Sequence, residues 1–125
     1  MPHKIILTPQ APAPIGPYSQ AVEANGMLFV SGQVALHPRT NELIISNIED
    51  ETHQVMLNVG EILKAAGKTY GQIVKTTIFL KDMNNFGQVN KIYGQYFEGN
   101  YPARETVEVA RLPKDVNVEI SVIAI

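Results

Sequence analysis

The sequence predicts an α+β fold, a single mixed β-sheet with two helices on one of its faces. The chain has 125 residues with 45% hydrophobic and 18% charged content, which suits one globular domain spanning residues 1–125. Several short segments alternate polar and apolar side chains with the period of a strand, and two longer segments have helical periodicity. Their order is strand, hairpin, helix, strand, helix, strand, strand.

The first part of the chain predicts a strand, a surface segment and a hairpin. Residues 4–7 form a short apolar strand, and residues 8–17 contain prolines at positions that exclude pairing in a sheet. Strands at 19–23 and 27–31 are joined by an Asn-Gly pair, which is a strong hairpin signal. Gly32 follows and predicts a bulge or a close backbone approach.

The middle of the chain changes to helical periodicity. Between residues 48 and 66 the apolar side chains lie on one stripe, Asn47 and Asp50 form a typical N-cap pair, and Gly67 is a stop signal. Residues 73–81 then alternate as a strand, and one of its sides carries Val74, Thr76, Ile78 and Leu80.

The last part of the chain predicts a second helix followed by two strands. The helix is expected from Asn84 or Asn85 to Phe97, with inward-facing Phe86, Val89, Tyr93 and Phe97. Residues 106–109 alternate as a strand, residues 112–115 form a turn, and residues 116–125 form the final strand.

Two helices can cover only one face of this sheet. Residues 27–30 are apolar on both sides, and Ile123 and Ile125 lie on the side of the last strand opposite to its main apolar row. An uncovered apolar face is an association site. We therefore expect a homo-oligomer with these faces packed together and ligand grooves at the subunit boundaries.

Composition argues against several classes of function. Ten Lys and Arg against twelve Asp and Glu give a net charge of −2, whereas nucleic-acid binding usually requires a basic surplus, so no nucleic-acid partner is expected. The absence of cysteine excludes disulfides and thiolate chemistry and fits a reducing compartment. No stretch approaches membrane-spanning length. We expect a soluble cytoplasmic protein without a membrane partner.

Common catalytic motifs are also missing. There is no Gly-x-Ser-x-Gly elbow and no glycine-rich phosphate loop. The histidines lie in unrelated segments, so no metal site is expected. What remains is a set of single residues at predicted strand ends or on a helix: Tyr18, Ser31, Gly32, Asn90, Arg104 and Glu119.

Arg104 has the clearest chemical role among these residues. Pro102 fixes the approach to the strand, so Arg104 lies at a stiffened strand entry. A guanidinium held in this way can bind a small carboxylate through two parallel hydrogen bonds. The alternative is an arginine in a surface salt bridge.

The other candidates have structural alternatives of equal simplicity. Glu119 is either an exposed strand glutamate or a partly buried carboxylate near a positive partner. Tyr18 could be a packed aromatic side chain whose hydroxyl finds a carbonyl, and Asn90 could face solvent.

Taken together, these residues resemble the Rid family (YjgF type, RidA subfamily). The resemblance runs over nearly the whole chain and rests on five segments and a final glutamate: Gly16-Pro17-Tyr18-Ser19-Gln20, Ser31-Gly32-Gln33, Ile73-Val74-Lys75-Thr76-Thr77, Pro102-Ala103-Arg104, Val107-Glu108-Val109-Ala110-Arg111-Leu112-Pro113 and Glu119. It implies a chorismate-mutase-like fold and a homotrimer with clefts between subunits. The implied activity is hydrolysis of 2-iminobutanoate, 2-iminopropanoate and their enamine precursors, made by pyridoxal-phosphate enzymes, to 2-keto acids and ammonia without a cofactor.

The resemblance also implies residue roles. Arg104 would bind the substrate carboxylate, Glu119 would lie beside the attacking water, and Tyr18 would contact the substrate. Ser31 and Gly32 would line the cleft, and Asn90 would line or support it.

Many relatives carry cysteine where this chain has Thr106, so only a hydroxyl or the backbone could hold a water there. This difference leaves open a non-catalytic trimer that binds 2-keto acids. The deaminase hypothesis requires that Arg104 does not point into bulk water and that Glu119 does not lie on the far side of the sheet from it.

Overall fold

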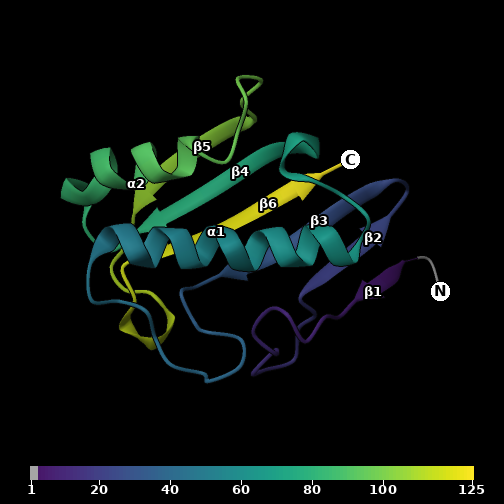
Figure 1. The fold of residues 1–125 in the computed structure, drawn as a ribbon, viewed down its shortest axis with the longest axis horizontal. Coiled ribbons are helices and arrows are strands. Elements are labelled where there is room, and N and C mark those ends of the chain that lie inside the picture. The colour runs from purple at the N-terminus through teal and green to yellow at the C-terminus, as the bar shows by residue number, and fades with distance from the viewer. Residues whose placement is uncertain (1–2) are drawn as a thin grey trace.

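The computed structural model describes residues 3–125, and its elements follow the predicted order (Figure 1). The strands are β1 (Lys4–Ile6), β2 (Ala21–Ala24), β3 (Met27–Gln33), β4 (Ile73–Leu80), β5 (Ala103–Glu108) and β6 (Val118–Ala124). The α-helices are α1 (Ile48–Ala65) and α2 (Phe86–Gly94), and single 3-10 turns occur at η1 (Tyr70–Gln72), η2 (Met83–Asn85) and η3 (Pro113–Asp115). No helix within residues 3–125 has the length and apolar character needed to span a membrane.

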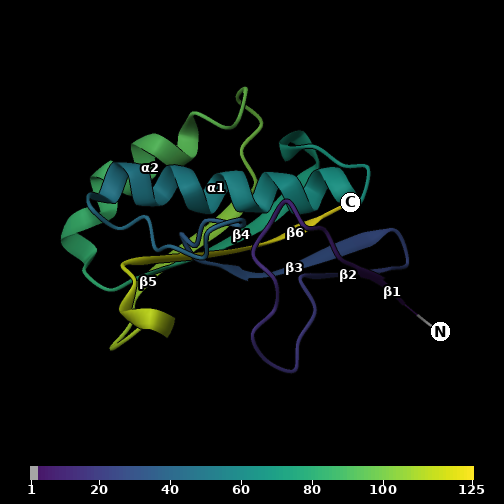
Figure 2. The same ribbon diagram turned by 60° about the horizontal axis from the view of Figure 1, so that its bottom comes forward.

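The strands form one mixed sheet in the order β1-β2-β3-β6-β4-β5. All neighbours are antiparallel except β4 and β5, which are parallel because α2 connects them as a crossover. Both helices lie on the same side of the sheet (Figure 2). The predicted fold class is therefore confirmed.

Helix α1 is fixed by contacts at its start. The Asn47 side chain accepts a hydrogen bond from the Asp50 backbone N–H at 2.8 Å, so the predicted N-cap is confirmed. One turn later the buried Glu51 carboxylate accepts hydrogen bonds from the backbone N–H groups of Asn117 and Val118 at 2.7 and 3.1 Å. Glu51 therefore joins α1 to the start of β6, a link that hydrophobic periodicity does not reveal.

Some predicted boundaries and faces are wrong. A register shift between Ile73 and Lys75 turns Ile73 toward the core and leaves Val74 39% exposed, contrary to the predicted side. Helix α2 ends at Gly94 before the predicted Phe97, and Phe86 at its start is 38% exposed. Strand β5 begins at Ala103 and not at the predicted Thr106, so Arg104 is the second residue of the strand.

The proline-rich segment, residues 8–17, is held by the buried side chain of Gln20. The Gln20 amide accepts a hydrogen bond from Thr8 N–H at 2.7 Å and donates to the carbonyls of Thr8, Ala11 and Pro12 at 3.0, 3.3 and 2.9 Å. Part of this segment and the turn η3 project from the side of the sheet opposite to the helices (Figure 2).

That opposite side, the open face, carries exposed apolar side chains in the single chain. Ile5, Val22, Phe29 and Ile123 form one cross-strand row from β1 to β6. Ile5 is 47% exposed and Phe29 is 42% exposed. The row agrees with the predicted association surface.

Candidate functional site

Arg104 extends from the helix side of the sheet toward α2. Strand pairing aligns Arg104 with Thr76 and Thr76 with Val122, and both partners are buried under the helices. The Nη1 group of Arg104 donates a hydrogen bond to Asn90 Oδ1 at 2.6 Å. The guanidinium carbon lies 5.6 Å from the ring centroid of Phe86 and 5.2 Å from that of Tyr93.

Arg104 has no acidic partner among residues 3–125. The ion pairs in this part of the chain are Lys75–Glu105 and Lys81–Asp115. The surface salt-bridge alternative for Arg104 is therefore rejected. Its guanidinium instead borders a cavity of about 430 Å³ lined by Asn90, Tyr93, Gly94, Tyr101, Pro102 and Arg104. The remaining N–H donors leave it suited to an external anion.

Tyr93 stiffens the wall behind this guanidinium. Its hydroxyl donates a hydrogen bond to Thr76 Oγ1 at 2.9 Å. Burial raises the pKa of the Tyr93 hydroxyl, so it remains a neutral donor at physiological pH. The neutral Tyr93 ring then contacts the Arg104 guanidinium as an aromatic partner, and its hydroxyl carries no negative charge that would form an ion pair with the guanidinium.

Glu119 lies on the open face, on the central strand β6. It pairs with Phe79, which in turn pairs with Val107. A Cβ atom at Gly32 would collide with the Glu119 carboxylate, so only glycine allows this close approach. The register of β3 also shifts between Val30 and Gln33, so the predicted bulge and close approach at Gly32 are both present. Burial raises the pKa of the Glu119 carboxyl.

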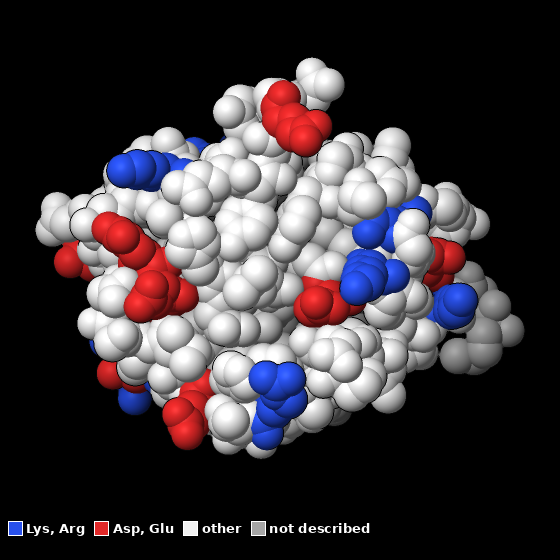
Figure 3. Space-filling view, viewed as in Figure 1, with Lys and Arg blue, Asp and Glu red and all other residues white. Residues whose placement is uncertain are grey.

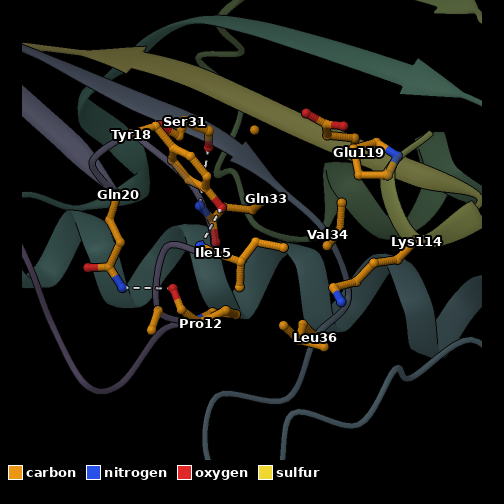
Figure 4. Close-up of a pocket in the computed structure, with 13 residues that line it drawn as sticks. Pro12, Ile15, Tyr18, Gln20, Ser31, Gln33, Val34, Leu36, Lys114 and Glu119 are labelled. Carbon is orange, nitrogen blue, oxygen red and sulfur yellow. Dashed lines mark hydrogen bonds between the residues drawn. The ribbon is translucent and has the colours of Figure 1, made fainter.

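Glu119 and Gly32 belong to a second cavity of about 390 Å³ (Figure 4). Its walls come from residues 12–20, strand β3 and the residues that follow it, the turn η3 and strand β6: Pro12, Ala13, Ile15, Tyr18, Gln20, Ser31, Gly32, Gln33, Val34, Leu36, Pro113, Lys114 and Glu119. The Ser31 hydroxyl donates to the Ser19 carbonyl at 2.6 Å, so it fixes the wall instead of acting as a free nucleophile. Tyr18 is 49% exposed at the cavity edge.

The candidate residues therefore divide into two groups. Tyr18, Ser31, Gly32 and Glu119 line the open-face cavity, whereas Asn90 and Arg104 line the cavity beside α2. Thr106 lines neither of them, and its buried hydroxyl has no hydrogen-bond partner in the described chain. Pairing with Ile78 places Thr106 on the same side of β5 as Arg104.

The required proximity of Arg104 and Glu119 is not met within one chain. Strand β4 separates their strands, and their side chains leave opposite faces of the sheet. Two strand spacings amount to roughly 10 Å, and the backbone of the sheet stands between the two groups. A site that contains both residues can form only between two chains.

Residues 8–125 match the sequence family described as Endoribonuclease L-PSP, which is the family of the YjgF and Rid proteins. The chain belongs to the Rid family. A RutC family protein of Synechocystis is 57% identical to it over 127 residues, covering 100% of this chain and 98% of that protein.

Two further relatives have more specific descriptions. The 2-iminobutanoate/2-iminopropanoate deaminase of Mus musculus is 50% identical over 122 residues, covering 98% of this Rid chain and 90% of the mouse protein. The crystal structure of E. coli TdcF with bound serine superposes with a TM-score of 0.94 at 45% identity and 98% coverage of both chains. These likenesses confirm the YjgF-type fold of the chain.

Sequence reasoning missed several residues that shape these cavities. Tyr101 and Tyr93 line the Arg104 cavity, and Gln20 and Lys114 line the Glu119 cavity. Gln20 belongs to the segment Gly16–Gln20, which resembles the Rid family, and Lys114 belongs to the predicted turn at residues 112–115. In neither case do the neighbouring residues in the sequence indicate which distant residues the side chain will meet.

Proposed function

We propose that this Rid protein hydrolyses small 2-imino acids, such as 2-iminobutanoate and 2-iminopropanoate, and their enamine precursors to 2-keto acids and ammonia. The observation that carries the proposal is the geometry of Arg104, a guanidinium oriented by Asn90, flanked by aromatic rings and without an acidic partner in the described chain. The name of the mouse relative supports the reaction, and serine bound to TdcF supports a ligand with an α-carboxylate.

The proposed site lies between two chains of a homotrimer. Strand β5 is an edge strand, so Arg104 is placed at a border of the sheet where another chain can approach. The Glu119 cavity adjoins the open face, whose exposed apolar row favours association. One chain would supply Arg104 and Asn90, and its neighbour would supply Tyr18, Ser31, Gly32 and Glu119.

The reaction needs orientation, a water and two proton transfers, without a cofactor. Arg104 binds the substrate carboxylate, and the Glu119 carboxylate takes a proton from water as the water oxygen bonds to the imine carbon. The C=N electron pair moves to nitrogen, which receives that proton from Glu119. Glu119 then transfers the hydroxyl proton of this adduct to nitrogen, the C–N bond breaks, and the 2-keto acid and ammonia leave.

The other candidate residues would shape the site. Gly32 lets the Glu119 carboxylate approach the backbone, and Tyr18 covers the substrate from the cavity edge. Thr106 lies on the same side of β5 as Arg104, but its hydroxyl is buried in the described chain and lines neither cavity, so the proposal gives it no water to hold.

The test is replacement of Arg104. We expect Arg104→Ala to slow hydrolysis of 2-iminobutanoate about 10²- to 10⁴-fold, because two charge-assisted hydrogen bonds to the carboxylate are lost. Keto-acid formation is measured with the imine supplied by a threonine dehydratase. Arg39→Ala, in an exposed loop outside both cavities, is the control and should retain activity. Ammonia release by Arg104→Ala at the wild-type rate would contradict the proposal.

A second candidate function is a trimer that binds 2-keto acids without turnover. It is favoured by one observation, that the cavity beside α2 is lined by Arg104 and its hydrogen-bond partner Asn90 but not by Glu119. Saturable binding of 2-oxobutanoate, measured by calorimetry, together with no acceleration of imine hydrolysis, would support this function over the deaminase.

The family description also names an endoribonuclease. On the helix side of this chain, basic side chains are scattered among acidic ones and form no continuous basic patch (Figure 3). The net charge of −2 also argues against RNA as the substrate. We expect no RNA binding at low salt.

A further inference from the structure

The Glu119 cavity contains a basic side chain that the proposed reaction does not use. Lys114 is the only Lys or Arg among the residues that line this cavity. Figure 4 shows its ammonium group and the Glu119 carboxylate on opposite sides of the cavity, with apolar side chains such as Val34 and Ile15 also lining it. The cavity is therefore acidic at one end, basic at the other and apolar in much of its wall.

The backbone that carries Lys114 has an unusual conformation. Lys114 has φ 56° and ψ 19°, and the next residue, Asp115, also has φ 56°. Consecutive left-handed residues other than glycine are strained, and such strain is found most often at functional sites. The turn is held by the Asp115 N–H bonded to the Leu112 carbonyl at 3.0 Å and by the Val116 N–H bonded to the Pro113 carbonyl at 3.3 Å.

Lys114 is free to bind an external anion. Its neighbour Asp115 is paired with Lys81 at 2.9 Å, and no ion pair of the described chain includes Lys114. Glu119 shares the cavity without forming an ion pair with Lys114, and burial is the cause of the raised pKa of Glu119. The ammonium group therefore does not neutralise the carboxylate.

The dimensions of the cavity suggest what Lys114 binds. A volume of about 390 Å³ lies within the range of small-molecule sites, roughly 300–1,000 Å³. In the single chain, the methyl or ethyl side chain of 2-iminopropanoate or 2-iminobutanoate would fill only part of this volume. A longer side chain that starts near Glu119 could follow the apolar wall and end at Lys114.

We infer that Lys114 favours 2-imino acids whose side chain ends in a second carboxylate, such as the imine of glutamate. This inference rests on the proposed function and names a substrate class for the same site. A reaction that oxidises the α-amine of an acidic amino acid would supply such an imine, and hydrolysis would release a 2-keto dicarboxylate and ammonia.

The test compares two imines of equal chain length, made in place by amino-acid oxidases from glutamate and from norvaline. Loss of the semicarbazone trapped from each imine gives kcat/KM for hydrolysis. We expect the wild type to prefer the glutamate-derived imine and Lys114→Asn to lower that preference about tenfold or more. Asparagine tolerates the left-handed backbone, so the change removes the charge with little added strain. Lys114→Arg should keep the preference, and Lys68→Asn, outside the cavity, is the matched control.

Binding separates this inference from the proposed function. Calorimetry with 2-oxoglutarate and 2-oxopentanoate should show tighter binding of the dicarboxylate by the wild type and no such difference for Lys114→Asn. That result without any imine hydrolysis would overturn the proposed function but support the role of Lys114. Equal affinity of the wild type for 2-oxoglutarate and 2-oxopentanoate would overturn the inference. An equal fall in kcat/KM for both imines in Lys114→Asn would also overturn it, and so would a changed oligomer mass of this variant.

Discussion

At the residue scale, Glu119 shows how a side chain gains a chemical role from its surroundings. It lies against the backbone of Gly32, on a face where its cross-strand neighbours are Phe79 and then Val107. Burial among these groups raises the pKa of its carboxyl. A pKa raised toward neutral pH makes the ionised carboxylate a stronger base and brings both protonation states within reach at working pH, which suits a group that takes a proton and later returns it.

Imine hydrolysis should depend on pH through this group. Below its raised pKa Glu119 is protonated and cannot take a proton from water, so kcat/KM should fall as the pH is lowered through that pKa and reach a plateau above it. Glu119→Gln should lower kcat/KM about 10²- to 10⁴-fold and abolish its fall at low pH.

The matched control is Glu105→Gln on the exposed side of β5. A hydrogen bond from Lys75 lowers the pKa of Glu105, and the residue lines neither cavity. An unchanged pH profile in Glu119→Gln would rule out Glu119 as the base.

At the element scale, the proline-rich segment acts as a wall because Gln20 holds it. Its prolines exclude sheet pairing, so the segment cannot be fixed by a ladder of backbone hydrogen bonds. The Gln20 side chain, 1% exposed, supplies the missing hydrogen bonds to Thr8, Ala11 and Pro12. Ile15 of this segment and Tyr18 directly after it then form one side of the Glu119 cavity.

Gln20→Ala should therefore affect both stability and substrate binding. Loss of the amide leaves the Thr8 N–H and several carbonyls without partners, at a cost of about 2–4 kcal/mol in unfolding free energy. We expect KM to rise more than kcat falls, because Arg104 and Glu119 are untouched. Urea unfolding and steady-state kinetics measure the two effects.

Gln10→Ala, in the same segment but exposed and without a side-chain hydrogen bond in the described chain, is the control. Equal effects of the two substitutions would show that Gln20 does not hold the wall.

At the scale of the whole molecule, each chain carries Arg104 and Glu119 on opposite faces of its sheet. Arg104 belongs to the helix side of the edge strand β5, and Glu119 belongs to the open face of β6. The exposed apolar row across β1, β2, β3 and β6 gives a physical reason for chains to associate. Oligomerisation would then complete the proposed site as well as bury this face.

Mixed oligomers test this arrangement. Arg104→Ala and Glu119→Gln should each be inactive alone, whereas mixed trimers of the two, obtained by co-expression, should regain about a third of wild-type activity. A cyclic trimer that contains both variants has three interfaces, and only one of them has an intact Arg104 on one side and an intact Glu119 on the other. Activity is measured on purified oligomers that carry two different affinity tags. Mixed oligomers without activity would contradict the two-chain proposal.

The sequence by itself determined the order of the elements and the signals at their ends. The Asn25-Gly26 turn, the Asn47 cap and the irregularity at Gly32 all depend on residues a few positions apart, so local stereochemistry is sufficient to predict them. The Rid resemblance also pointed to Arg104 and Glu119, although their spacing in the chain does not say how they lie in space.

Tertiary structure decided which face each side chain occupies and which residues meet. A single register shift moves Val74 out of the core, because each step along a strand reverses the side-chain direction. The contacts of Gln20 and Glu51 likewise depend on segments brought together by folding. Arg104 and Glu119 lie on opposite faces because strand pairing fixes their directions, and only the packing of a second chain can bring such groups into one site.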